Sequence, residues 1–441
     1  MTGADPYVPG HGDLRYEVVH HDLTLTYALP SNRLEGEAVL LCRAAVQLSQ
    51  VRLDLQLKPS KVTVSGRPVR RFRSGRGSLT VDLPGPVAAG TEFIVAVRYA
   101  GNPRPISMRG MDPAGWEELE DGVIVASQPH GAPSWFPCND RPSSKSTYAL
   151  TFTTAADYHV EFSGEPVSAR RRGATRTWTF RQDEAIPAYL ATVQIGRYRV
   201  VDQPAVVPLR VVGPADIRPN GFSASFGLQP QMMAFFVAAF GPYPFSTYTA
   251  VITDDDLEIP LESAALSTFG RNVATGDWDN VRLVAHEMAH QWFGNAVTAE
   301  RWSDIWLHEG FACYAEWLWS EESGGRSAQE WAGHHHAVLA GQSQPQPLVD
   351  PTPALMFEDW VYKRGALTLH AVRAEVGDDV FLEVLRSWVA RHRGGTVTTP
   401  LFEAHCAAVS GRDLGDLFTA WLRKRSLPPL PQAAPGRIRV P

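Results

Sequence analysis

The sequence has little of several features that mark other classes of protein. Its 441 residues carry only four cysteines, which lie far apart and form no CxxC pair: Cys42, Cys138, Cys313 and Cys406. This spacing indicates neither a thiolate zinc site nor a redox motif, so we expect reduced and largely buried thiols. The longest apolar stretch, residues 232–240, is too short to span a bilayer.

An excess of positive charge is also missing. The net charge is −6, and only five of the 41 basic residues are lysine. Such a chain has no basic field that would attract nucleic acid or an anionic membrane, so we expect neither partner. The first 19 residues lack the basic and apolar regions of a secretory signal, and a cytoplasmic location is therefore expected.

The chain is too long for a single compact core, and its first half is typical of β structure. Short segments alternate between apolar and polar residues, and turn residues separate them. The predicted strands span residues 16–29, 33–46, 50–66, 78–84, 92–99, 147–154, 158–164, 176–181 and 191–201. Many short strands at this spacing indicate an antiparallel sandwich or a saddle-shaped sheet.

The pattern changes to helical periodicity after about residue 212. The predicted helices span residues 223–240, 278–293, 305–320, 328–340, 362–375, 378–391, 400–409 and 414–424, with one short strand near 247–253. We therefore predict an α+β protein with two domains. A β domain covers residues 1–212, and a mainly helical domain covers residues 213–441.

The first candidate site is the segment His286-Glu287-Met288-Ala289-His290, an HExxH motif. Residues four apart share one face of a helix, so both imidazoles can reach the same ion. The competing interpretation is a chance match, with both histidines hydrogen-bonded in a core. A second helical segment, residues 302–317, carries Glu309 and favours the metal site. Two histidines and one carboxylate leave one position open, as a catalytic zinc requires, so we expect one zinc ion per chain.

Several segments together resemble the gluzincin zinc aminopeptidases of family M1. They are HEMAHQWFGNAVT with WSDIWLHEGFA, WFPCNDRPSSKSTY at 135–148, IPAYLATVQIGRY at 186–198 and FGPYPFSTY at 240–248. The resemblance implies an N-terminal β saddle followed by a thermolysin-like catalytic domain. Members of this family usually carry a further helical domain, so the chain resembles a two-domain short form. An open active-site mouth that admits peptides longer than tripeptides is then expected, unless dimerisation covers it.

The resemblance also implies two catalytic residues beside the ligands His286, His290 and Glu309. Glu287 would accept a proton from the attacking water. Tyr362 matches the tyrosine of the family's Tyr-x-Lys-Gly segment, whose hydroxyl stabilises the oxyanion. A packing role is the alternative for this tyrosine. Arg364 stands where the family has lysine.

Two further residues are implied to bind the free α-amino group of the substrate. Glu262 is the one residue retained from the family's Gly-x-Met-Glu-Asn segment, and Glu258 is a rival four residues earlier. Gln128 precedes the 135–148 segment, where relatives have Gln or Glu, with an ordinary surface glutamine as the alternative. Asp304 is predicted either to orient a ligand histidine or to cap its own helix. The run His334-His335-His336 is predicted to be a solvated helix face.

The sequence therefore predicts an aminopeptidase that removes the N-terminal residue of peptides. A pocket wall formed by Leu261, with Met356 or Phe357, would favour neutral or hydrophobic residues. The alternatives are a thermolysin-type endopeptidase, a bifunctional or epoxide-hydrolase-like relative, and an inactive zinc scaffold that binds peptides. The oligomeric state, monomer or dimer, stays open at this point.

Overall fold

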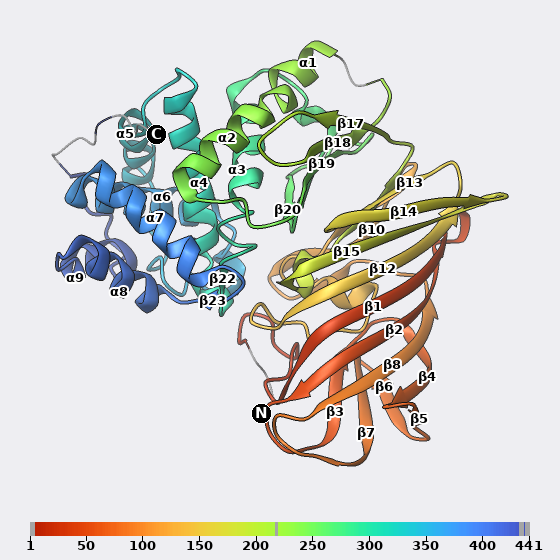
Figure 1. Cartoon of the computed structure of the whole chain (residues 1–441). Coiled ribbons are helices and arrows are strands. Elements are labelled where there is room, and N and C mark those ends of the chain that lie inside the picture. The colour runs from red at the N-terminus through yellow and green to blue at the C-terminus, as the bar shows by residue number, and fades with distance from the viewer. Residues whose placement is uncertain (1–4, 217–218, 432–435, 437–441) are drawn as a thin grey trace. The chain divides into compact units, whose positions relative to one another are not determined.

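A computed structural model describes residues 5–216, 219–431 and 436 of the chain (Figure 1). The chain forms two compact units. The first comprises residues 1–201, 210–216 and 245–271, and the second comprises residues 202–209, 217–244 and 272–441. Each unit is described by itself below.

The first unit is built around an eight-stranded sheet with the order β14-β15-β12-β1-β2-β8-β4-β5. Its strands are β1 (Tyr16–Ala28), β2 (Arg33–Ala44), β4 (Lys58–Val64), β5 (Arg67–Pro68), β8 (Glu92–Gly101), β12 (Lys145–Ala155), β14 (Glu165–Arg172) and β15 (Thr175–Pro187). Apolar and polar residues alternate along these strands, so that one face of the sheet is buried. In β1, Leu23, Leu25 and Tyr27 are buried, whereas the polar residues between them are exposed. β1 pairs in parallel with β12, and the other neighbours pair antiparallel.

Smaller sheets complete the first unit. One has the order β13-β16-β11-β10-β9 and another the order β3-β7-β6. Their strands are β3 (Leu48–Asp54), β6 (Phe72–Gly75), β7 (Ser78–Val87), β9 (Ile106–Met108), β10 (Met111–Leu119), β11 (Gly122–Ala126), β13 (His159–Phe162) and β16 (Val193–Gly196). The single strands expected over 50–66 and 191–201 are wrong, because each region contains two strands that belong to different sheets.

The last sheet has the order β17-β18-β19-β21-β20. Its strands are β17 (Arg199–Gln203), β18 (Leu209–Gly213), β19 (Tyr248–Ile252), β20 (Leu261–Ser263) and β21 (Leu266–Phe269). Val212, Val251 and Leu266 form a fully buried cluster within it. The short strand expected near 247–253 is confirmed as β19. β20 pairs antiparallel with β21, which fixes the position of Glu262 at the edge of the sheet.

The second unit is mainly helical, as expected. Its helices are α1 (Pro219–Ala224), α2 (Gln229–Phe240), α3 (Trp278–Ala289), α4 (Trp306–Glu322), α5 (Ala328–Ala340), α6 (Asp359–Val376), α7 (Asp378–His392), α8 (Thr399–Ser410) and α9 (Gly415–Phe418). A two-stranded parallel sheet joins β22 (Thr298–Ala299) to β23 (Thr396–Val397). Two expected helices are interrupted, since a 3-10 turn separates α1 from α2 and α9 continues as a π-helix, Thr419–Arg423.

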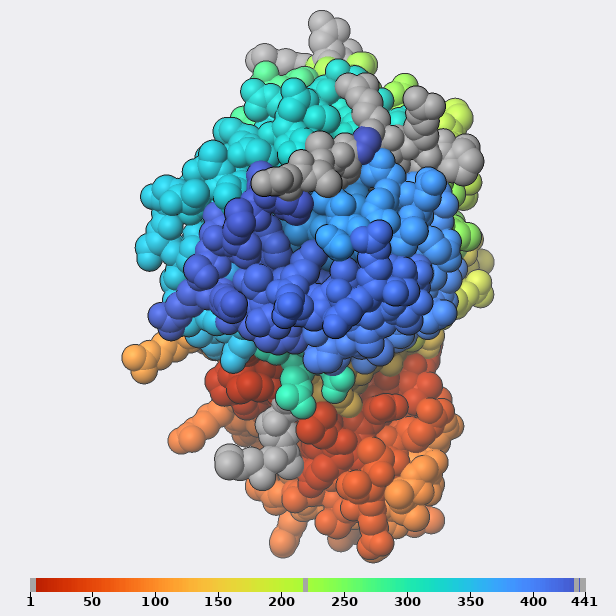
Figure 2. Space-filling model, turned by 90° about the vertical axis from the view of Figure 1, so that its left-hand side faces the viewer, coloured from red at the N-terminus to blue at the C-terminus, as the bar shows by residue number. Residues whose placement is uncertain are grey.

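The C-terminal helices α6, α7 and α8 pack against one another in the second unit. Residues from about 360 to 425, coloured blue, form a continuous face in the space-filling view (Figure 2).

All four cysteines of the chain are free and buried, as expected. Within the described residues, no helix combines the length and apolar character needed to cross a membrane.

Candidate metal centre

Three side chains of the second unit converge in a buried cluster. His286 and His290 lie four residues apart at the end of α3, and Glu309 lies in the first turn of α4. Glu309 Oε2 is 3.4 Å from His286 Nε2 and 3.2 Å from His290 Nε2. The three ligand atoms lie within 4.8 Å of one another, and all three residues are buried. The sequence spacing therefore predicted this cluster correctly.

Hydrogen bonds behind the cluster orient both imidazoles. His286 Nδ1 lies 2.7 Å from Glu316 Oε1, and His290 Nδ1 lies 3.0 Å from the Phe293 carbonyl oxygen. Acceptors at both positions place the ring protons on Nδ1. Each Nε2 then carries the lone pair that faces the Glu309 carboxylate, which is the usual arrangement around protein-bound zinc.

The chemistry of the donor set fits zinc. Burial alone would raise the pKa of Glu309, but His290 and His286 hold it well below its usual range. Burial would likewise raise the pKa of Glu316, whereas Lys363, Arg282 and His286 lower it to about 2. Two imidazole nitrogens and an ionised carboxylate, with one position left open, form the ligand set of a catalytic zinc. His286, His290 and Glu309 thus form a donor set that fits a catalytic zinc ion.

Two glycines bring Tyr362 close to this cluster. α4 and α6 cross where Gly310 meets Gly365, and a Cβ atom on Gly310 would lie only 2.7 Å from the Gly365 Cα atom. Any larger residue would force the helices apart. The crossing places the Tyr362 ring against His286, with a centroid distance of 5.9 Å and an interplanar angle of 24°. Glu287 follows His286 on α3 and is only 4% exposed.

The two predicted amine-binding residues come together in the first unit. Gln128 and Glu262 line one small cavity with Ser127 and Ser263, and its apolar wall includes Leu261. The cavity volume is about 10 Å³, which holds one group of the size of a water molecule. The rival Glu258 is exposed in the loop before β20 and does not line the cavity. The glutamate on the strand is therefore the one placed beside Gln128.

The structure corrects both expectations for Asp304 and defines the contacts of Arg364. Asp304 neither contacts a ligand histidine nor caps its own helix, because its Oδ1 accepts hydrogen bonds from the Thr399 hydroxyl and N–H at the start of α8. Arg364 is fully buried, and its guanidinium donates to the carbonyl oxygens of Trp421 and Arg425, at 2.9 and 2.8 Å. Arg364 thus caps the C-terminal end of the π-helix.

Sequence reasoning missed Glu316, the residue that holds His286. It lies seven residues after Glu309, two turns further along the same face of α4.

We expect Glu316→Gln to weaken zinc binding by about 10- to 100-fold, because the amide cannot stabilise the imidazole as a carboxylate does. Zinc affinity measured by competition with a chromophoric chelator checks this. Unchanged affinity would show that Glu316 serves packing alone.

The chain was compared with known proteins. The Peptidase M1 N-terminal domain matches residues 17–190, and the Peptidase family M1 domain matches residues 225–421. An M1 zinc metallopeptidase from Deinococcus radiodurans, solved as a mutant bound to a Tyr-Ser-Ala substrate, is 31% identical with a TM-score of 0.91. That match covers 98% of this chain and 100% of the other.

Two curated relatives are longer proteins. Aminopeptidase 2 from Candida albicans is 24% identical, with 96% of this chain and 49% of the relative covered. Aminopeptidase N from Oryctolagus cuniculus is 28% identical, with 70% and 35% covered. This chain therefore spans about half the length of these relatives, or less.

The fold and the ligand set define a zinc metallopeptidase with a β-rich N-terminal domain and a helical catalytic domain. The chain belongs to peptidase family M1. The resemblance inferred from the sequence and the predicted α+β fold class are thereby confirmed.

Proposed function

We propose that the chain is a zinc aminopeptidase that hydrolyses the N-terminal residue from peptides. The observation that carries this proposal is the buried cluster of His286, His290 and Glu309, with Glu287 and Tyr362 beside it. Zinc, when bound there, supplies a Lewis acid that polarises a carbonyl group and lowers the pKa of a coordinated water to about 7.

The residues of this chain supply the proton transfers. Glu287 is buried and directly follows His286 in the sequence. Its carboxylate accepts a proton from the attacking water. The same carboxyl group then donates this proton to the leaving amine. Such a cycle needs one acid–base group at the scissile bond, and Glu287 is the acidic side chain in the HExxH motif.

Tyr362 stabilises the negative charge that develops on the carbonyl oxygen. In support, its ring lies against the ring of His286, one of the three metal ligands. We expect Tyr362→Phe to lower kcat by about 100- to 1,000-fold with a smaller change in KM, since the lost hydrogen bond acts mainly in the transition state. Steady-state kinetics check this. An equal loss in kcat and stability would instead indicate a packing residue.

Glu262 and Gln128 bind the α-ammonium group of the substrate. In support, both line a cavity of about 10 Å³ in the first unit, which matches the size of an ammonium group. Leu261 on the same wall favours neutral or hydrophobic N-terminal residues. Of the other two residues expected in the pocket wall, Phe357 is 39% exposed and Met356 is fully buried. We also propose that the two functional domains meet between residues 212 and 213. In support, this boundary lies between the two segments that match the family, residues 17–190 and 225–421.

A panel of aminoacyl fluorogenic substrates, assayed with and without a strong chelator, tests the proposed function. We expect release from leucyl, alanyl and phenylalanyl substrates well above release from aspartyl and glutamyl ones, and full loss of activity with the chelator. Activity toward an epoxide substrate with none toward the panel would favour the epoxide-hydrolase alternative. No activity toward either, with zinc bound, would indicate an inactive scaffold.

A further inference from the structure

Tyr362 lies at the end of α6 that the helix itself fixes least. It is the fourth residue of the helix, and the first N–H groups of an α-helix have no partners inside it. Within the part of the chain that the structure describes, the N-cap residue Glu358 adds no side-chain hydrogen bond to this end. The direction of the Tyr362 side chain therefore depends on what supports the first turn of α6 from outside.

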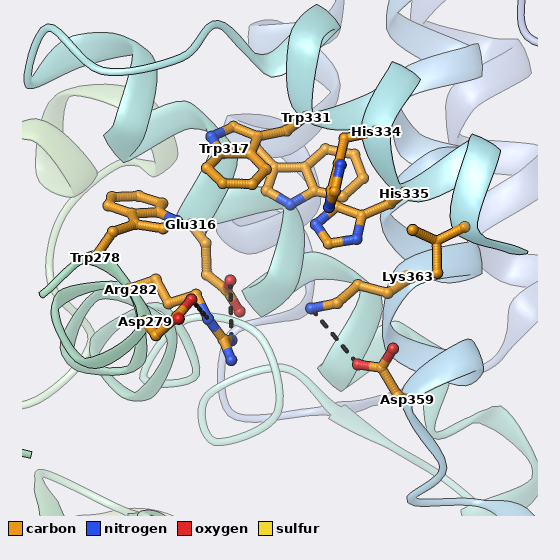
Figure 3. Close-up of a pocket in the computed structure, with 11 residues that line it drawn as sticks. Trp278, Asp279, Arg282, Glu316, Trp317, Trp331, His334, His335, Asp359 and Lys363 are labelled. Carbon is orange, nitrogen blue, oxygen red and sulfur yellow. Dashed lines mark hydrogen bonds and ion pairs between the residues drawn. The ribbon is translucent and has the colours of Figure 1, made fainter.

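One side of this turn borders a cavity of about 280 Å³ in the second unit (Figure 3). Lys363 and Asp359 line it, and their ion pair, with Nζ and Oδ1 3.8 Å apart, joins two residues of the same helix. The Lys363 ammonium also donates to the Cys313 sulfur of α4 at 3.4 Å, and a thiol is a weak acceptor. This side therefore gives the turn little support.

Another wall of the cavity is a stack of aromatic rings that belongs to α4 and α5. The His335 ring stacks on Trp331 with centroids 5.7 Å apart and on Trp317 with centroids 5.3 Å apart. Burial lowers the pKa of His335 to about 4, so its ring is neutral at pH 7. The prediction of a solvated histidine face is wrong for His335. The stack joins α5 to α4 and contains no residue of α6.

Arg364 supports the turn from a different side. It lies two residues after Tyr362, so the two side chains leave the helix in nearly opposite directions. The guanidinium is fully buried, and burial lowers its pKa to about 10, which leaves it charged at pH 7. Five backbone carbonyl oxygens accept hydrogen bonds from it, those of Ala420, Trp421, Lys424, Arg425 and Ser426.

The acceptors belong to one segment, the π-helix Thr419–Arg423 and the residues that follow it up to 426. This segment has contacts of its own with the second unit. Leu422 is fully buried, and its carbonyl oxygen accepts a hydrogen bond from the Val349 N–H at 3.1 Å. Further along, the Pro428 carbonyl oxygen accepts one from His336 Nε2 at 2.7 Å. Arg364 thus joins the first turn of α6 to a segment that other elements hold in place.

An arginine suits these acceptors better than the lysine that the family has at this position. A guanidinium group spreads five N–H donors around a plane, whereas an ammonium group carries three donors at one point. A lysine at position 364 could therefore reach only some of the five carbonyl oxygens.

We propose that Arg364 is a positioning residue for the reaction, which holds the first turn of α6, and with it Tyr362, against residues 419–426. This inference rests on the proposed function, in which the Tyr362 hydroxyl stabilises the oxyanion. The effect of Arg364 passes through Tyr362, so it belongs to the transition state and changes kcat more than KM.

The test is a double-mutant cycle of Arg364→Lys with Tyr362→Phe, assayed on a leucyl fluorogenic substrate. With Tyr362 present, we expect Arg364→Lys to lower kcat by about 10- to 100-fold and to change KM by less than about twofold, because a shift of about 1 Å in a catalytic group has an effect of this size. In the Tyr362→Phe protein the same change should lower kcat by less than about twofold, since the hydroxyl is already gone.

Arg373→Lys is the matched control, because Arg373 is also a fully buried arginine but lies near the other end of α6. Its kcat should equal that of the wild type. Leu422→Ala loosens the same C-terminal segment without a change at Arg364, so it takes the place of Arg364→Lys if that variant does not fold, and the same pattern is expected. Equal losses with and without the Tyr362 hydroxyl, or no loss in either protein, would overturn the inference and leave the aminopeptidase intact.

If the wild type cleaves nothing, the proposed function fails, and hydrogen exchange measured by mass spectrometry still decides about Arg364. The backbone amides of residues 363–366 should exchange about tenfold faster in Arg364→Lys than in the wild type or in Arg373→Lys, because the first turn opens more often. Equal exchange in all three proteins would overturn the inference.

Discussion

Replacing Glu287 with glutamine should leave one zinc ion per chain and lower kcat by about 1,000-fold. The amide keeps the volume of the side chain but cannot accept a proton from the attacking water, and general-base catalysis contributes about 100- to 10,000-fold. Because the metal ligands are His286, His290 and Glu309, the substitution leaves the zinc site complete. Metal analysis and steady-state kinetics on the same preparation check both halves of this expectation.

Glu322→Gln is the matched control, since this glutamate lies at the exposed end of α4. Its kcat should equal that of the wild type. A Glu287→Gln enzyme that holds zinc and keeps wild-type turnover would show that another group moves the proton.

Removing the Glu262 carboxylate should lower kcat/KM by about 100-fold or more. An N-terminal ammonium must leave water to enter the small cavity beside Gln128, and without a carboxylate partner its charge stays uncompensated. Removal of one member of a buried ion pair costs about 3–5 kcal/mol. Each 1.4 kcal/mol corresponds to a factor of ten, so the expected loss in Glu262→Ala is at least two orders of magnitude.

Glu258→Ala provides the control for this prediction, because Glu258 is exposed and lies outside the cavity. Its kcat/KM should change by less than a factor of three or so, in line with a surface substitution. If Glu258→Ala proves the crippling variant, the amine binds four residues earlier in the chain than proposed.

The metal cluster could be predicted from the sequence because its spacing follows from helix geometry alone. His286 and His290 share a helix face whatever surrounds them, and Glu309 needs only a second helix that returns. Glu316 was missed although it lies on the same face of α4 as Glu309. A search for acidic residues at i+7 from the carboxylate ligand would have found it.

The strands were predicted less well where the chain changes sheet. Alternation continues through residues 50–66, yet β3 belongs to the three-stranded sheet and β4 to the eight-stranded one. The alternation of apolar and polar residues shows which side chains of a strand face a core, but it does not show which sheet the strand joins. In the same way, the run at 334–336 looked solvated, since nothing local reveals that Trp317 and Trp331 would stack on His335.

The central claim, a zinc-dependent aminopeptidase, is tested most directly by one mass-spectrometric time course. A single decapeptide, with a free and with an acetylated N-terminus, is incubated with zinc-loaded and with metal-stripped protein. We expect stepwise loss of N-terminal residues from the free peptide with the zinc-loaded protein, and no cleavage in the other three combinations. Cleavage of the acetylated peptide, or hydrolysis by the metal-stripped protein, would contradict the account.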